Sequence, residues 1–152
     1  MTHNLYILLT DDDEDDRFLF QEALQCVDPT IHCDTAKNGR EALSFLGKLH
    51  EKLPDVIFLD INMPQLNGWE FLSLIKQNSA LSFIPIIMYS TSSHTVHVEK
   101  AKDLGAWGFC TKPDAMDELV RILKFIVKNF KQGLNLNSVA DLNTSNLTIF
   151  HH

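Results

Sequence analysis

Short apolar segments alternate with longer amphipathic segments through the first 131 residues of this chain. The apolar segments have the length of strands, and three of them are almost wholly apolar, as in Val56-Ile57-Phe58-Leu59. Strands that are apolar on both faces are typical of a parallel sheet covered by helices on each side. We therefore expect strands near residues 5–10, 31–36, 55–59, 86–90 and 107–111.

The segments between these strands repeat their apolar residues every three or four positions, which indicates amphipathic helices. The pattern is clearest towards the end of the alternating region, where Leu119, Ile122, Leu123 and Ile126 would share one face. Alternation of strand and helix five times over predicts an α/β domain with a doubly wound, five-stranded parallel sheet. The expected helices cover residues 14–27, 39–50, 67–78, 93–104 and 114–131.

The last part of the chain, residues 133–152, has a different composition. It contains no Lys, Arg or Glu and is rich in Asn, Ser and Thr. Its scattered apolar residues could dock on the domain or leave the segment disordered, and it is too short to fold as a second domain. We expect one domain over residues 1–132, followed by a C-terminal tail over 133–152.

Charge and cysteine content narrow the class of protein. The formal net charge of −7 argues against a protein that binds nucleic acid or an anionic membrane by bulk electrostatics. No segment has the pattern of a signal peptide or the roughly 20 apolar residues of a membrane span. The odd cysteine count, without a C-x-x-C pair, indicates reduced thiols at Cys26, Cys33 and Cys110. We expect a cytoplasmic protein that contacts neither membrane nor nucleic acid directly.

Charged residues follow three of the expected strands. Asp11 and Asp12 come after the first strand, Asp60 after the third, and Lys112 after the fifth. The carboxyl ends of parallel strands meet at one edge of the sheet, where ligands bind. Crowded carboxylates repel one another, and a divalent cation relieves the repulsion. Mg²⁺ prefers oxygen ligands, which Asp12, Asp60 and a backbone carbonyl just after Asp60 could supply, while Asp11 could hold a metal-bound water.

The same residues have ordinary interpretations when each is taken alone. An acidic run can be a solvated turn with favourable charge at a helix start, and a single lysine can simply add solubility. Together they favour phosphoryl chemistry. Asp60 would be the nucleophile that forms an aspartyl phosphate, Lys112 would pair with Asp60 and then with a phosphoryl oxygen, and the Ser90 hydroxyl could donate to that group.

With these residues assembled, residues 4–131 resemble the receiver domain of two-component response regulators. No single motif is decisive, but all of them in this order at these spacings are highly specific. The resemblance implies a flavodoxin-like parallel sheet of strand order 2-1-3-4-5. The motifs are Asp11-Asp12, the stretch 36–43, Asp60-Ile61-Asn62-Met63-Pro64, Asn67-Gly68, Ser90 and Lys112-Pro113.

The resemblance also implies a role for each site residue. Asp60 would accept a phosphoryl group from a phosphohistidine on a sensor histidine kinase or phosphotransfer protein. Mg²⁺ would be held by Asp12, Asp60 and the Asn62 carbonyl, with Asp11 acting through water. Ser90 and Lys112 would contact the phosphoryl group, and the Lys112–Pro113 peptide bond would be cis. Such a protein catalyses its own phosphorylation and dephosphorylation but is mainly a signalling switch.

Phe109 takes the position of the family's aromatic switch. Phosphorylation adds about −1.5 to −2 charge, which would draw Ser90 inward and let Phe109 turn into the space left. The surface of the fourth helix, fifth strand and fifth helix would change, where a downstream protein target or a second copy of the chain reads the state. Phe109 replaces the commoner Tyr, so a switch based on an outer hydroxyl is not expected. Trp107 would lie near this surface, either as an interface residue or as a cover over a helix.

Three alternative functions are less well supported. A haloacid-dehalogenase-like phosphatase needs its nucleophile on the first strand and a second Asp two residues later, where this chain has Asn62. A flavodoxin-type flavin module needs a first loop that accepts a phosphate, and the acidic loop after the first strand would repel one. A degenerate receiver would bind partners without phosphorylation, but the complete set of site residues argues against it.

Overall fold

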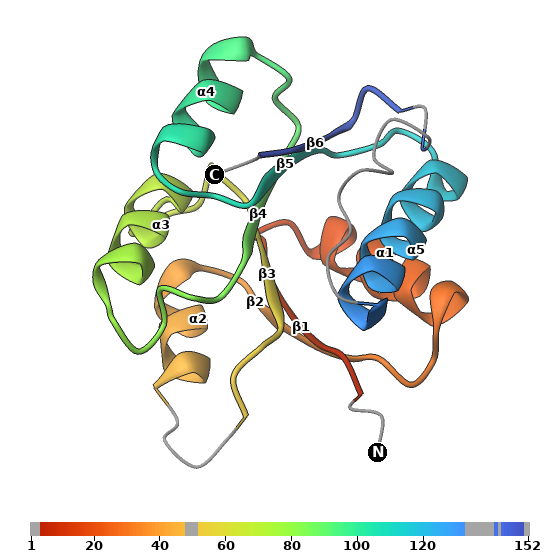
Figure 1. The fold of residues 1–152 in the computed structure, drawn as a ribbon, viewed down its shortest axis with the longest axis horizontal. Helices are drawn as coiled ribbons and strands as arrows, with labels where there is room; N and C mark the ends of the chain where they lie inside the picture. Colours follow the sequence, from red (N-terminus) through yellow and green to blue (C-terminus); the bar gives the residue numbers. More distant parts are fainter. Residues whose placement is uncertain (1–3, 48–51, 133–141, 143, 151–152) are drawn as a thin grey trace.

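Strands and helices alternate along the chain as the sequence predicts (Figure 1). The computed structural model describes residues 4–47, 52–132, 142 and 144–150. The strands are β1 (Tyr6–Thr10), β2 (His32–Ala36), β3 (Val56–Leu59), β4 (Ile86–Ser90), β5 (Gly108–Thr111) and β6 (Leu147–Ile149). The helices are α1 (Glu14–Val27), α2 (Gly39–Leu46), α3 (Gly68–Gln77), α4 (Thr95–Asp103) and α5 (Met116–Gln132).

The strands form one sheet in the order β2-β1-β3-β4-β5-β6. The first five strands are parallel and have the predicted order, so the expected flavodoxin-like fold is confirmed. All five predicted parallel strands are present, and the C-terminal tail adds a further, antiparallel strand, β6, beside β5. Only three residues of the polar tail form this strand, which is too short a run for alternation to stand out.

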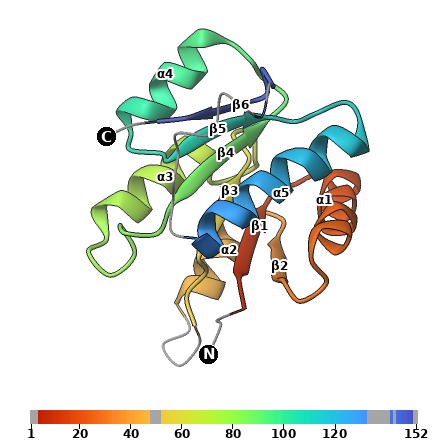
Figure 2. The ribbon, with the colours of Figure 1, turned by 45° about the vertical axis from the view of Figure 1, so that its right-hand side comes forward.

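Helices cover both faces of the sheet (Figures 1 and 2). Helices α1 and α5 lie on one face, and α2, α3 and α4 lie on the other. Strands β1, β3 and β4 between them are wholly buried, as the apolar segments predict. Under α1, the rings of Phe20, Phe58 and Tyr89 pack edge to face with centroids 4.9–6.0 Å apart.

One helix end differs from the expectation, and the position of Trp107 decides between two alternatives. Helix α2 ends at Leu46 with Gly47 at its C-terminus, earlier than the predicted residue 50; residues 48–50 lie outside the described residues. Trp107 is half-buried, and its ring packs against Phe130 of α5 with centroids 5.3 Å apart. Trp107 therefore covers a helix, which is the second of the two roles considered for it.

Candidate functional site

Backbone hydrogen bonds between strands bring the charged residues to one edge of the sheet. At the end of β1, the Asp11 amide donates to Ala36 O at 3.0 Å, and the Asp60 amide after β3 donates to Thr10 O at 2.9 Å. The Lys112 amide after β5 donates to the carbonyl of Ser90 at 2.7 Å. The ladder of the parallel sheet thus aligns the ends of β1, β3, β4 and β5 at the predicted edge.

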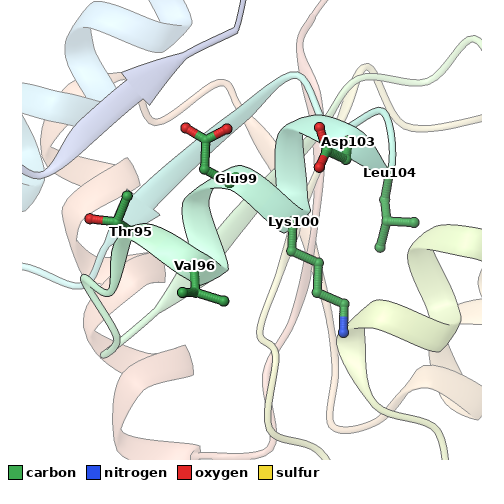
Figure 3. Close-up of a pocket in the computed structure, with 6 residues that line it drawn as sticks. All are labelled: Thr95, Val96, Glu99, Lys100, Asp103 and Leu104. Atoms are coloured by element: carbon green, nitrogen blue, oxygen red, sulfur yellow. The ribbon is translucent and has the colours of Figure 1, made fainter.

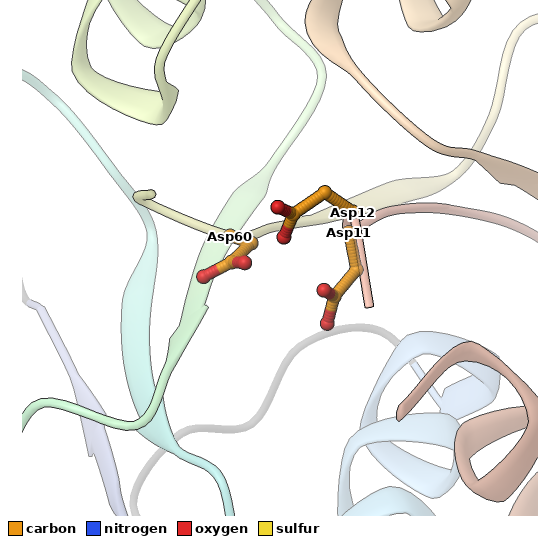
Figure 4. Close-up of side chains that lie close together, drawn as sticks. All are labelled: Asp11, Asp12 and Asp60. Carbon is orange, nitrogen blue, oxygen red and sulfur yellow. The ribbon is translucent and has the colours of Figure 1, made fainter. Parts of the chain in front are cut away.

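Three carboxylates share a small space at this edge (Figure 4). One oxygen from each of Asp11, Asp12 and Asp60 lies within 4.8 Å of the others. Asp11 and Asp60 are buried, whereas Asp12 is exposed. The cluster is therefore enclosed by protein on one side and open to solvent at Asp12.

Lys112 provides the positive charge of the site. Its Nζ lies 2.8 Å from Asp11 Oδ2, 2.8 Å from Asp16 Oδ2 and 3.8 Å from Asp60 Oδ2. The expected ion pair between Lys112 and Asp60 is present, but its N–O distance is the longest of the three. Asp16 was not among the predicted site residues, because an acidic residue in the first turn of a helix is common without any ligand.

Burial opposes negative charge on two of the carboxylates. It raises the pKa of Asp60 to about 7, although the nearby Lys112 ammonium lowers that pKa, and the Asp11 carboxylate raises it further. Burial also raises the pKa of Asp11, against the hydrogen bond and charge of Lys112. Burial opposes the charge on Lys112 as well, but bonds to Asp11 and Asp16 outweigh this and raise its pKa. The site therefore holds a protonated Lys112 beside two carboxyl groups, Asp11 and Asp60, whose pKa values are raised.

The raised pKa of Asp60 predicts how stability depends on pH when divalent metal is removed. Between the ordinary aspartate pKa of 3.8 and about 7, the unfolded chain ionises Asp60 while the folded chain keeps it protonated. The free energy of unfolding should therefore fall as the pH rises through this window and then level off. A rise of the pKa from 3.8 to about 7 corresponds to about 4 kcal/mol, and partial access of solvent should reduce the effect to about 2 kcal/mol.

Urea unfolding in EDTA at pH 4.5 and pH 8 would measure this effect in the parent and in Asp60→Asn. The difference between the two proteins isolates Asp60 from every other carboxyl group. The parent should lose more stability than the variant as the pH rises. An equal change in both proteins would show that Asp60 ionises normally in the folded state.

A close backbone approach fixes the loop that follows Asp60. Asp60 Oδ1 accepts the Ile61 amide at 2.8 Å, and the Gly68 amide donates to Ile61 O at 2.8 Å. A Cβ added at Gly68 would lie only 2.2 Å from Asp60 O and 2.8 Å from Ile61 Cα. The start of α3 can therefore lie against Asp60 only because residue 68 has no side chain.

Gly68→Ala should push α3 away from Asp60 and destabilise the protein by about 2–3 kcal/mol. Gly39→Ala is a matched control, because Gly39 also begins a helix behind an Asn cap. A Cβ there would meet the flexible side chain of Leu66, at 2.8 Å, instead of backbone atoms. Urea unfolding should give the larger loss for Gly68→Ala; equal losses would contradict the proposed role of the close contact.

The remaining predicted site residues lie at or near the same edge. Ser90 is fully buried at the end of β4, and its Oγ accepts the Ser92 amide at 3.1 Å. Asn62 is exposed in the loop two residues after Asp60. Phe109 is already buried, with 2% of its surface exposed. The cis prediction for Lys112–Pro113 was wrong, since no peptide bond among the described residues is cis.

The carboxylate cluster fits a hard divalent cation. All three side chains offer oxygen, which Mg²⁺ prefers, and Asp12 leaves room for the water molecules that Mg²⁺ retains. A cation would also relieve the electrostatic cost of ionising Asp11 and Asp60 together. Asp11, Asp12 and Asp60 are therefore the residues that could hold a metal, where it would neutralise charge on a bound oxyanion.

A hollow lies along α4 (Figure 3). Its volume is about 450 Å³, and its lining includes Val96, Lys100 and Leu104. Val96 is 75% exposed.

Among the described residues, no helix is both long and apolar enough to cross a membrane.

Sequence comparisons match the chain to one family. The model for the response regulator receiver domain matches residues 7–124. Protein PilG of Pseudomonas aeruginosa is 36% identical over 102 residues, which cover 66% of this chain and 73% of PilG. The probable transcriptional regulator ycf29 of Pyropia yezoensis is 33% identical over 125 residues, covering 82% of this chain. The chain spans 54% of that regulator, and 36% of a similar protein-glutamate methylesterase from Methanococcoides burtonii.

Solved structures agree with the sequence comparisons. The phosphorylated cyanobacterial phytochrome response regulator RcpA is 30% identical with a TM-score of 0.76, over 86% of this chain and 96% of RcpA. The chemotaxis regulator CheY4 of Vibrio cholerae is 31% identical with a TM-score of 0.70, over 82% of this chain and 99% of CheY4. The phosphatase alternative has no support, since these relatives are response regulators and Asp60 follows β3. The chain belongs to the response regulator receiver domain family, whose members bind Mg²⁺ at an acidic pocket.

Proposed function

We propose that Asp60 accepts a phosphoryl group from a phosphohistidine on a sensor histidine kinase or phosphotransfer protein, and that the aspartyl phosphate switches partner binding. The observation that carries this proposal is the position of the Asp60 carboxylate, at a strand end beside two further carboxylates and an ammonium. A carboxylate nucleophile next to a cation site and a lysine is suited to phosphoryl transfer.

The two oxygens of Asp60 would have different roles. Oδ1 accepts the Ile61 amide at 2.8 Å, whereas Oδ2 faces Lys112 Nζ at 3.8 Å. Oδ2 is therefore the proposed nucleophile: it forms the new bond to phosphorus while the bond from phosphorus to the histidine nitrogen breaks. Lys112 and the Ser90 hydroxyl would then contact phosphoryl oxygens. Attack by water on phosphorus would later return Asp60 to its free form, so the chain would catalyse both steps on itself.

When bound, Mg²⁺ would neutralise negative charge on the phosphoryl oxygens. We assign its protein ligands as Asp12, Asp60 and the carbonyl of Asn62, with Asp11 acting through a water molecule. Asp11 is suited to this indirect role because its Oδ1 already accepts the Asp13 amide at 3.0 Å. Its Oδ2 forms the ion pair with Lys112.

The phosphoryl donor would dock on α1. Phe18 and Leu19 of this helix are 61% and 44% exposed, and Met116 at the start of α5 is 39% exposed. Leu19 and Met116 line a hollow of about 210 Å³ that also contains Lys112. A donor protein must bring its phosphohistidine to Asp60, and this apolar surface beside Lys112 offers the contact area.

A downstream protein target, or a second copy of the chain, would read the state on α4. Val96 offers an exposed apolar side chain there, and α4 follows directly on the loop after Ser90. We expect the protein to act in the cytoplasm, consistent with the free thiols of Cys26, Cys33 and Cys110.

Intact-mass measurement with acetyl phosphate tests the proposed function. With Mg²⁺ the chain should gain the mass of one phosphoryl group, and with EDTA it should gain none. Failure to gain mass in Mg²⁺ would favour the degenerate receiver, which binds partners without phosphorylation. A phosphohistidine protein as donor then tests the docking surface. Phe18→Ala should slow transfer from that donor but not from acetyl phosphate, whereas Phe83→Ala, at an exposed residue before β4, should change neither.

A further inference from the structure

Strand β6 covers the outer edge of β5. The register pairs Gly108 with Ile149, Phe109 with Thr148 and Cys110 with Leu147. Hydrogen bonds continue the ladder at both ends, from the Thr111 amide to Asn146 O at 2.7 Å and from the Phe150 amide to Trp107 O at 3.0 Å. Figure 1 shows β6 lying along β5 at the end of the sheet. The polar groups of this edge are therefore paired within the chain.

The contact with β6 is closely packed. Leu147, Ile149 and Phe150 are 4%, 8% and 6% exposed. A Cβ added at Gly108 would lie 2.9 Å from both Ile149 Cδ1 and Thr148 O. Thr148 stands opposite Phe109 in the register, and Phe109 is 2% exposed, so β6 lies directly beside the switch candidate.

A continuous set of hydrogen bonds joins Ser90 to β6. The Ser92 amide donates to Ser90 Oγ at 3.1 Å, and Thr111 Oγ1 donates to Ser92 O at 3.1 Å. Besides the Thr111 amide bond to Asn146 O, Asn146 Nδ2 donates to Thr111 O at 2.9 Å. Asn146 thus holds Thr111 by both of its backbone polar groups, and Thr111 directly precedes Lys112.

We propose that docking of β6 opposes phosphorylation of Asp60, and that phosphorylation in turn releases β6 and frees the β5 edge for an extended strand of a partner protein. The proposal rests on the function assigned to Asp60. Contact with a phosphoryl group on Asp60 would draw Ser90 Oγ and Lys112 Nζ, which lies 3.8 Å from Asp60 Oδ2, towards that group. Both residues are tied to Thr111, which β6 holds in place. Coupling between two sites is reciprocal, and a free strand edge accepts a partner strand through backbone hydrogen bonds.

A reversible disulfide between β5 and β6 tests the coupling within one protein. Cys110 and Leu147 are a facing pair between the hydrogen-bonded pairs 109/148 and 111/146. The Cα atoms of such a pair are typically about 4.5 Å apart, within the range that a disulfide spans. Leu147→Cys would therefore bond to the native Cys110 on oxidation. Replacing Cys26 and Cys33 with Ser prevents other disulfides, and the same protein without the Leu147 change is the matched control.

The oxidised protein should incorporate phosphoryl from acetyl phosphate and Mg²⁺ at least about fivefold more slowly than its reduced form, because couplings of this kind are commonly 5–150-fold. The control should react equally in both redox states. Equal rates for the locked and reduced forms would overturn the role of β6 while leaving the function of Asp60 intact. A reduced form that is not phosphorylated at all would instead overturn the proposed function, and the inference with it.

Hydrogen exchange in the parent chain provides a second test that does not depend on the disulfide. Beryllium fluoride with Mg²⁺ serves as the phosphoryl analogue. Its addition should speed amide exchange in residues 147–149, and unchanged protection would contradict release of β6. Asn146→Ala removes one of the bonds to Thr111 and should speed phosphorylation, whereas Ser145→Ala, at an exposed neighbour, should not. Equal rates for these two variants would argue against the path through Thr111.

Discussion

Asp60→Asn is expected to abolish phosphoryl incorporation from acetyl phosphate, leaving less than about one hundredth of the parent's labelling. An amide is not a nucleophile towards phosphorus, so the aspartyl phosphate cannot form. The neighbouring acids should not replace Asp60. Asp11 is fully buried with both oxygens engaged, by the Asp13 amide and by Lys112. Asp12 is exposed and would be needed to hold the metal.

Intact-mass measurement at saturating acetyl phosphate and Mg²⁺ checks this result. Asp15→Asn is the matched control, since it removes the same charge from an exposed acid in the first turn of α1. The control should label like the parent. If Asp60→Asn gained a phosphoryl group as readily as Asp15→Asn, another residue would be the acceptor.

Lys112→Met is expected to lower the free energy of unfolding by about 3 kcal/mol in EDTA at pH 8. The side chains of Lys112 and Asp11 are 10% and 0% exposed, so the substitution leaves buried carboxylates without their counter-charge. Removing one partner of a buried ion pair typically costs about 3–5 kcal/mol. Mg²⁺ should restore part of the loss, because a cation bound by Asp12 and Asp60 supplies positive charge to the same cluster.

Urea unfolding of matched variants separates this effect from the general loss of a lysine. Lys131→Met removes an exposed lysine that pairs with Asp28, and pairs of this kind contribute little. The double variant Lys112→Met/Asp11→Asn should recover part of the lost stability, since it also removes a buried charge. A loss no larger than that of Lys131→Met would show that Lys112 does not neutralise the cluster.

Much of the fold could be predicted from the chain because the strands are buried on both faces. Segments such as Val56–Leu59 are apolar throughout, and the turn and cap residues between them mark where each element ends. The sixth strand could not be predicted in the same way. Leu147 and Ile149 are buried only because the outer edge of β5 is next to them, and neighbours across a sheet are not visible in a three-residue run.

The sequence predicts which residues of the candidate site lie at the strand ends, but it does not predict which of their side chains contact one another. The position of Asp11, Asp60 and Lys112 at one edge follows from the parallel sheet alone. The shorter ion pairs of Lys112 with Asp11 and Asp16 depend on how the first turn of α1 is oriented over β1. Phe109 is buried beside β6, where Thr148 stands opposite it in the register, so the sequence could not show this neighbour.

Chemical trapping of the phosphorylated residue tests the central claim most directly. Borohydride reduces an acyl phosphate to an alcohol, so an aspartyl phosphate at residue 60 becomes homoserine. After incubation with acetyl phosphate and Mg²⁺, peptide mass spectrometry should find homoserine at position 60, and the EDTA sample should show only Asp60. Conversion at Asp11 or Asp12 instead of Asp60, or at no aspartate, would contradict the proposal that Asp60 is the phosphoacceptor.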